Sequence, residues 1–169
     1  MLISEEYRSL NQRMHEAMPS WGSNTHDMSW MAPYIKGYKS LLDYGCGKGR
    51  LNFPGLDYRK YDPAVPEFAD PPQAAELVLC ASVMEHVERD CLDNVLDHIR
   101  ALATRRVVFK VSTFDTDLRL ADHSSPHRIV ESADWWARKL LDRWSLIYAM
   151  TMPRGLRFIG DVEPFAGGN

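Results

Sequence analysis

The chain has 169 residues, of which 45% are hydrophobic and 25% are charged, and its net charge is −3. This length and composition are typical of one globular domain that is large enough to bury a core. The mild negative charge argues against a surface built to neutralise nucleic-acid phosphates, so nucleic acid is not indicated as a partner.

Three cysteines, Cys46, Cys80 and Cys91, form neither an even set nor a C-x-x-C pair. This pattern predicts a reducing, cytoplasmic location. No apolar run approaches the roughly 18 residues of a membrane-spanning helix, and the N-terminus lacks a basic region before an apolar core. We therefore expect no membrane partner, and the sequence leaves the oligomeric state open.

The first 38 residues are expected to form a helical cap or lid. Tyr7, Leu10 and Met14 recur at helical spacing, and this pattern predicts a helix over residues 4–18. The polar and aromatic stretch 21–30 is a candidate lid loop, and a short helix is expected over 31–37.

Residues 39–169 are expected to form the core of the same single domain, in which strands and helices alternate. The predicted strands are 40–44, 59–62, 76–81, 106–111, 145–152 and 156–162, and the longer helices are 90–103 and 132–144. Only a short helix fits after Gly49, because Pro54 and Gly55 interrupt it. The fold class is therefore α/β, a Rossmann-like, doubly wound and mainly parallel sheet with a C-terminal antiparallel hairpin strand.

A strand followed by a glycine-rich loop is the most informative motif. The apolar residues before Asp43 lead directly into G-x-G-x-G at Gly45–Gly49. Glycine permits positive φ and close approach of a ligand to the backbone, and the loop N–H groups can donate to that ligand. Asp62 follows Gly45 by 17 residues, near the ~20-residue offset at which an acidic side chain binds a ribose hydroxyl. Together these features predict a nucleoside cofactor.

These residues resemble the class I S-adenosylmethionine-dependent methyltransferases. That family has an acidic residue and G-x-G-x-G after its first strand and an acidic residue after its second, as Asp43 and Asp62 do here. Residues 76–87 resemble its fourth strand and the following helix start, and the likeness is close over residues 40–112. The resemblance implies S-adenosyl-L-methionine as cofactor and S-adenosyl-L-homocysteine as product. The family also has a helix and a third strand after this second acidic residue. Only residues 63–73 are available for them here, and they include four prolines in 11 positions. The sheet is therefore expected to be trimmed at the edge where strand three would lie.

The resemblance also assigns the cofactor site. Asp43 would accept from the cofactor amino group or from loop N–H donors, and Asp62 would accept from both ribose hydroxyls. Backbone groups of Ala81 and Ser82 would lie against the methionine part. The residues expected to contact the cofactor are Asp43, Gly45, Cys46, Gly47, Asp62, Pro63, Ala81, Ser82 and Glu85.

Three histidines are candidate catalytic residues. Glu85 and His86 resemble a pair that many small-molecule methyltransferases carry at this place, where His86 would shape the site or move a proton. His123 and His127 lie in the long polar stretch 112–131, which is expected to close over the acceptor with one histidine as general base. No metal is expected, because Ser-Ser-Pro between these two histidines prevents the helix that an H-x-x-x-H site needs.

The predicted function is methyl transfer to a small-molecule or sugar-like acceptor. The alternatives are a non-catalytic cofactor-binding module, a nucleic-acid or protein methyltransferase, an aminopropyl transferase and a nicotinamide oxidoreductase. The glycine spacing disfavours the last, since the nicotinamide motif is G-x-G-x-x-G/A. Enzymes that methylate the exocyclic amines of DNA bases carry Asp-Pro-Pro-Tyr after the fourth strand. The similar Asp70-Pro71-Pro72-Gln73 precedes that strand here, which argues against DNA base methylation by this route.

Overall fold

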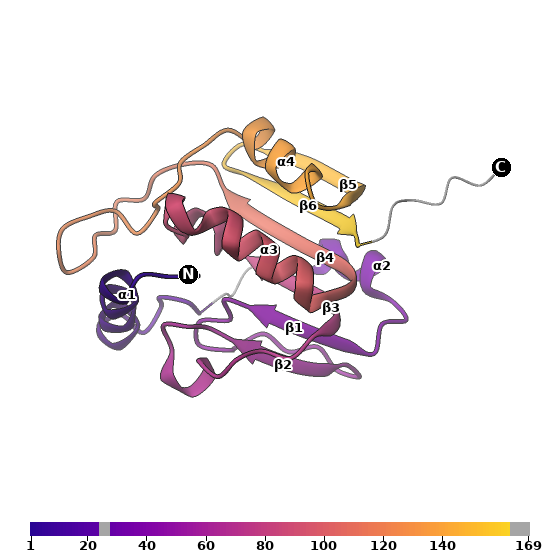
Figure 1. Cartoon of the computed structure of the whole chain (residues 1–169), viewed down its shortest axis with the longest axis horizontal. Coiled ribbons are helices and arrows are strands. Elements are labelled where there is room, and N and C mark those ends of the chain that lie inside the picture. Colours follow the sequence, from indigo (N-terminus) through magenta and orange to yellow (C-terminus); the bar gives the residue numbers. More distant parts are fainter. Residues whose placement is uncertain (24–27, 163–169) are drawn as a thin grey trace.

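A six-stranded β-sheet lies at the centre of the computed structural model, which describes residues 1–23 and 28–162. In the order β2-β1-β3-β4-β6-β5, the strands are β1 (Ser40–Tyr44), β2 (Asp57–Tyr61), β3 (Ala75–Ala81), β4 (Ala103–Ser112), β5 (Ser145–Met152) and β6 (Gly155–Asp161). The α-helices are α1 (Glu5–Ala17), α2 (Ala32–Ile35), α3 (Leu92–Leu102) and α4 (Ala133–Leu141). Figure 1 shows α3 and α4 side by side across one face of this sheet.

The sheet is mainly parallel. β1 runs parallel to β2 and β3, with Leu42 opposite both Arg59 and Val78, and β3 runs parallel to β4. β6 is antiparallel to both β4 and β5. This topology confirms the predicted α/β sheet with an antiparallel strand supplied by the C-terminal hairpin.

The edge next to β2 is shortened, as predicted. Between β2 and β3 the chain forms one 3₁₀ turn, Pro66–Phe68, and no further strand among the described residues. The prolines there cannot donate ladder hydrogen bonds. The short helix expected after Gly49 is wrong, because residues 45–56 form turns. Gly45, Gly47 and Gly49 all have positive φ, which directs this segment straight back to β2.

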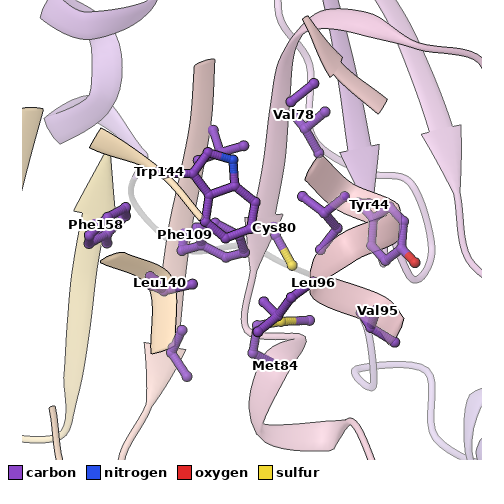
Figure 2. Packing of buried hydrophobic residues seen from close by; sticks show 14 of the residues in the cluster. Tyr44, Val78, Cys80, Met84, Val95, Leu96, Phe109, Leu140, Trp144 and Phe158 are labelled. Atoms are coloured by element: carbon purple, nitrogen blue, oxygen red, sulfur yellow. The ribbon is translucent and has the colours of Figure 1, made fainter. Parts of the chain in front are cut away.

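Both faces of the sheet are buried. Side chains from β4 alternate between them, with Val107 and Phe109 packing under α3 and α4 and Val108 packing on the opposite face. In Figure 2, Phe109 lies close to Trp144 and to other apolar side chains of the hydrophobic cluster under α3 and α4. The inward face of α3 has helical spacing and consists of Leu92, Val95, Leu96, Ile99 and Leu102.

The N-terminal segment divides between two places. α1 lies beyond the carboxyl ends of the parallel strands (Figure 1), and Ser4 caps it by accepting from the Tyr7 N–H at 3.1 Å. The short helix α2 instead belongs to the opposite sheet face, where Met31 is fully buried. Residues 24–27 of the predicted lid loop lie outside the described residues. A single cap formed by residues 1–38 stays a prediction, as does the single-domain assignment.

Within residues 1–23 and 28–162, none of the helices combines the length and the apolar character that crossing a bilayer requires.

Candidate functional site

A cavity of about 410 Å³ opens at the carboxyl ends of β1, β2, β3 and β4. This is the edge at which ligands bind in open parallel sheets. Five parts of the chain line it: the glycine loop, the segment after β2, the end of β3 with the turn that follows it, the region of α1, and the long loop after β4. The residues that the argument below uses are Tyr7, Asn11, His15, Gly45, Gly47, Asp62, Pro63, Ala64, Ala81, Ser82, Glu85, His86 and His127.

The glycine loop needs glycine for steric reasons. Gly45 has a φ of +76°, and a Cβ there would lie 2.4 Å from Cγ2 of Val83. Gly47 has a φ of +54°, and its Cβ would lie 2.4 Å from the carbonyl oxygen of Gly22. The loop can therefore be packed this tightly only without side chains.

The loop N–H groups are engaged within the protein, contrary to the expectation that they donate to a ligand. Gly45 and Cys46 both donate to the carbonyl oxygen of Tyr61, at 2.7 and 3.0 Å. Gly47 donates to Asp62, and Lys48 donates to the Gly22 carbonyl oxygen at 2.8 Å. No helix follows the loop, and these N–H groups bond either to the end of β2 and Asp62 or, for Lys48, to Gly22.

Asp62 lies at the wall of the cavity, and its contact with ribose hydroxyls stays a prediction. Its Oδ2 accepts from the Gly47 N–H at 2.9 Å, and its Oδ1 accepts from the Ala64 N–H at 2.9 Å. The residue is only 8% exposed. A carboxylate can accept about four hydrogen bonds, so these two bonds orient Asp62 and leave acceptor capacity for a ligand.

Asp43 is not among the cavity-lining residues and lies beneath the loop instead. It is buried, and its Oδ2 accepts from the Tyr58 hydroxyl at 2.6 Å. Its Oδ1 has no hydrogen-bond partner among the described residues. Burial raises the pKa of Asp43 to about 6, and the Tyr58 bond offsets this in part. The predicted contact with a cofactor amino group therefore finds no support in this geometry.

Cys46 is likewise absent from the cavity lining. Its side chain is buried, and burial raises the pKa of its thiol. The prediction that Cys46 contacts the cofactor is therefore without geometric support, whether through the thiol or through its N–H, which Tyr61 occupies.

The end of β3 and the turn after it contribute Ala81, Ser82 and Glu85 to the cavity, and their contacts with the cofactor stay predictions. Ser82 has a φ of +58°, an uncommon conformation for a residue other than glycine. Its N–H donates to the Lys110 carbonyl oxygen at 2.7 Å. Strained backbone of this kind is often found at functional sites.

Glu85 is the buried charged residue of this segment. It is 1% exposed, and neither carboxylate oxygen has a hydrogen-bond partner within the described residues. Burial raises the pKa of Glu85, and the nearby Ser112 and His127 offset this only in part. Its main-chain carbonyl oxygen accepts from the N–H groups of Arg128 and Ile129, at 2.8 and 3.1 Å. These two bonds hold the long loop after β4 against the turn at residues 84–86.

That connection brings His86 and His127 together. Their ring centroids are 4.8 Å apart. His86 donates through Nδ1 to the Pro126 carbonyl oxygen at 2.9 Å, and His127 donates through Nδ1 to the Phe114 carbonyl oxygen at 2.6 Å. A carbonyl oxygen only accepts, so in each neutral ring Nε2 carries the lone pair.

Burial favours the neutral form of both histidines. Burial lowers the pKa of His86 to about 4 and also lowers the pKa of His127. Because both rings line the cavity and hold an unprotonated nitrogen, either one can act as a proton acceptor.

The structure does not bring His123 into the cavity. His123 is exposed in a surface turn with a φ of +66°, and its N–H donates to the Leu120 carbonyl oxygen at 2.9 Å. The predicted catalytic role is therefore not supported for His123, whereas His86 and His127 remain candidates.

Sequence reasoning missed the contribution of α1. Tyr7, Asn11 and His15 line the cavity and are spaced four residues apart, which places them on one helix face. The helix is attached to the site, since the Tyr7 hydroxyl donates to the Pro126 carbonyl oxygen at 2.9 Å and Lys48 Nζ donates to the His15 carbonyl oxygen at 2.7 Å. The polar residues within an otherwise apolar face were the signal that could have identified this surface.

Several solved methyltransferases share this architecture. The 1,6-didemethyltoxoflavin-N1-methyltransferase of Burkholderia thailandensis, with 1,6-didemethyltoxoflavin and S-adenosylhomocysteine bound, matches with a TM-score of 0.65 and 16% identity over 96% of this chain and 91% of its own. The N-methyltransferase NodS of Bradyrhizobium japonicum WM9, in complex with S-adenosylhomocysteine, matches with a TM-score of 0.64 and 12% identity over 92% and 98%. The DhpI–SAH complex matches with a TM-score of 0.66 and 18% identity over 92% and 97%.

No protein-family model and no curated protein sequence matches the chain. The identities to the solved structures are low, so these likenesses establish the fold. The chain has the class I methyltransferase fold.

Replacing Gly47 by alanine should destabilise the protein more than replacing Gly55. Both residues have positive φ, but a Cβ at Gly47 meets the Gly22 backbone, whereas nothing lies within 4 Å of a Cβ at Gly55. We expect Gly47→Ala to lose about 1–3 kcal/mol more unfolding free energy than Gly55→Ala, as overpacking usually does. Urea denaturation measures both variants, and equal losses would show that the loop is not tightly packed against Gly22.

Asp43→Asn should stabilise the ligand-free protein at pH 8. The folded-state pKa of Asp43 is raised to about 6 from 3.8, so its stabilising contribution is complete below pH 3.8 and is lost as the pH rises through 6. We expect the variant to gain up to about 3 kcal/mol of unfolding free energy at pH 8, with no gain below pH 4. The exposed Asp70→Asn is the control, and a gain that does not depend on pH would contradict the explanation.

Proposed function

We propose that this chain binds S-adenosylmethionine in the cavity and transfers its methyl group to a small-molecule or sugar-like acceptor, which leaves S-adenosylhomocysteine. The observation that carries the proposal is Asp62, a carboxylate oriented by two backbone N–H groups at the cavity wall. The solved structures described above support it, since their S-adenosylhomocysteine complexes belong to the same fold.

The lining residues fit this cofactor. Asp62 has spare acceptor capacity for ribose hydroxyls, and Pro63 and Ala64 offer an apolar surface next to it for the adenine. Ala81 and Ser82, at the end of β3, also line the cavity and would lie against the methionine part. When bound, the cofactor supplies an electrophilic methyl group on a sulfonium.

The cavity size favours a small acceptor. Its volume of about 410 Å³ is near the lower end of the roughly 300–1,000 Å³ of small-molecule sites. A cofactor occupies much of that volume, so the acceptor must be small or must reach in with one end. The net charge of −3 gives no support to a nucleic-acid acceptor.

His86 and His127 would assist the transfer. Each lines the cavity and would carry its lone pair on Nε2, since Nδ1 donates to a backbone carbonyl oxygen. As the acceptor atom attacks the methyl carbon, one of these nitrogens would take the acceptor proton. Most of the rate enhancement would come from holding the two reactants in line.

A cytoplasmic location stays a prediction from the cysteine pattern.

Asp62→Ala should weaken binding of S-adenosylhomocysteine by about 10- to 100-fold, because it removes one or two charge-assisted hydrogen bonds to the ribose. Isothermal titration calorimetry measures the dissociation constant. Asp70→Ala is the matched control, since Asp70 is exposed and does not line the large cavity. An unchanged dissociation constant for Asp62→Ala would remove this carboxylate from the site.

The methyl-transfer step is tested with methyl-labelled S-adenosylmethionine and a panel of small hydroxyl and amine compounds. Transfer of label by the wild-type chain, reduced in Asp62→Ala, is the expected result. Tight cofactor binding with no transfer to any compound would instead favour a non-catalytic cofactor-binding module.

A further inference from the structure

We propose that Glu85, His86 and His127 bind one divalent transition-metal ion at the wall of the cavity. Each residue offers one potential ligand atom, and these atoms all lie within 4.8 Å of one another. Two imidazoles and one carboxylate are a recurrent ligand set for zinc and for iron(II). Sequence spacing does not reveal this set, because His127 is 41 residues from His86.

Both histidines are oriented as metal ligands are. A metal-binding imidazole usually donates its other N–H to a backbone carbonyl or a carboxylate, which fixes the ring and the tautomer. His86 does this with Pro126, and His127 does it with Phe114. The two Nε2 atoms are therefore the ones left to coordinate an ion.

Glu85 supplies an independent reason for a cation at this place. Its carboxylate is almost fully buried and lines the cavity, and neither oxygen has a donor with good hydrogen-bond geometry among the described residues, although Ser112 lies close enough to lower its pKa. A buried and unpaired carboxylate is costly unless it is protonated, paired or bound to a metal. A cation between Glu85 and the two rings would satisfy the carboxylate without any change of fold.

The distances require a small closure. Ligand atoms at about 2.0–2.1 Å from one ion lie roughly 3–3.5 Å apart, whereas the separations here reach up to 4.8 Å, so the most widely separated atoms must approach each other by about 1–2 Å. A small tilt of the His127 ring that keeps its hydrogen bond to Phe114 would supply this movement. All three residues line the cavity, and a site with three protein ligands keeps a coordination position for water or substrate.

The catalytic consequence rests on the proposed function. An ion at this place would favour loss of a proton from an acceptor hydroxyl. The proton passes to water, and the acceptor oxygen forms the new C–O bond as the C–S bond to the sulfonium breaks. The ion would then replace a histidine as the agent of deprotonation, and hydroxyl compounds become the expected acceptor class.

Equilibrium dialysis of the full chain, without a polyhistidine tag, against Zn²⁺ measures the number of bound ions and their affinity. In a second experiment, the visible absorption of added Co²⁺ reports whether protein ligands coordinate the ion. We expect one equivalent of Zn²⁺ in the wild type and at least about a 10-fold weaker affinity in Glu85→Gln and His127→Gln. His123→Gln is the matched control, because His123 is on the same loop but exposed, and it should bind as the wild type does.

No stoichiometric uptake by the wild type would overturn the proposal, as would equal uptake by His127→Gln and His123→Gln. Circular dichroism verifies the fold of each variant, and His127→Gln decides the question if Glu85→Gln does not fold. Titration with S-adenosylhomocysteine in the presence of a chelator separates the two proposals. Cofactor binding without metal uptake refutes the metal site alone, and metal uptake without cofactor binding refutes the proposed function alone.

Discussion

The hydrogen bond from the Gly47 N–H to the Asp62 carboxylate, at 2.9 Å, joins the loop after β1 to the end of β2. It depends on a parallel register that places both strand ends at one edge of the sheet. It also depends on the absence of a side chain at Gly47, where Gly22 fills the space that a Cβ would need. Asp62 is consequently held at the wall of the cavity with acceptor capacity left, which is what recognition of a ribose requires.

A second connection forms the opposite side of the cavity. The Glu85 carbonyl oxygen accepts two hydrogen bonds from the loop after β4, and the Pro126 carbonyl oxygen accepts from both Tyr7 and His86. Helix α1, the turn after β3 and the long loop therefore support one another. The Pro126 carbonyl oxygen thus fixes the His86 ring as well as α1, while the Phe114 carbonyl oxygen of the same loop fixes the His127 ring. The loop has neither helix nor strand, and its backbone bonds at these points hold the candidate residue His127 in place.

Much of the fold was predictable, because local patterns determined it: the strand–glycine loop before Asp62, the helical spacing in α3, and the proline-rich stretch too short for another strand. The direction of the loop N–H groups was not predictable, because it depends on whether a helix follows the loop. The meeting of Glu85 with His127 was not predictable either, because backbone hydrogen bonds between distant segments create it. Asp43 shows the same limit. Its residue type suggested a contact with a ligand, whereas its carboxylate accepts a hydrogen bond from Tyr58 beneath the loop.

A crystal structure of the chain with S-adenosylhomocysteine tests the central claim most directly. The account predicts electron density for the ligand in the cavity at the carboxyl ends of β1 to β4, with the ribose hydroxyls within hydrogen-bond distance of Asp62. An empty cavity at saturating ligand, or a ligand bound elsewhere on the molecule, would contradict it.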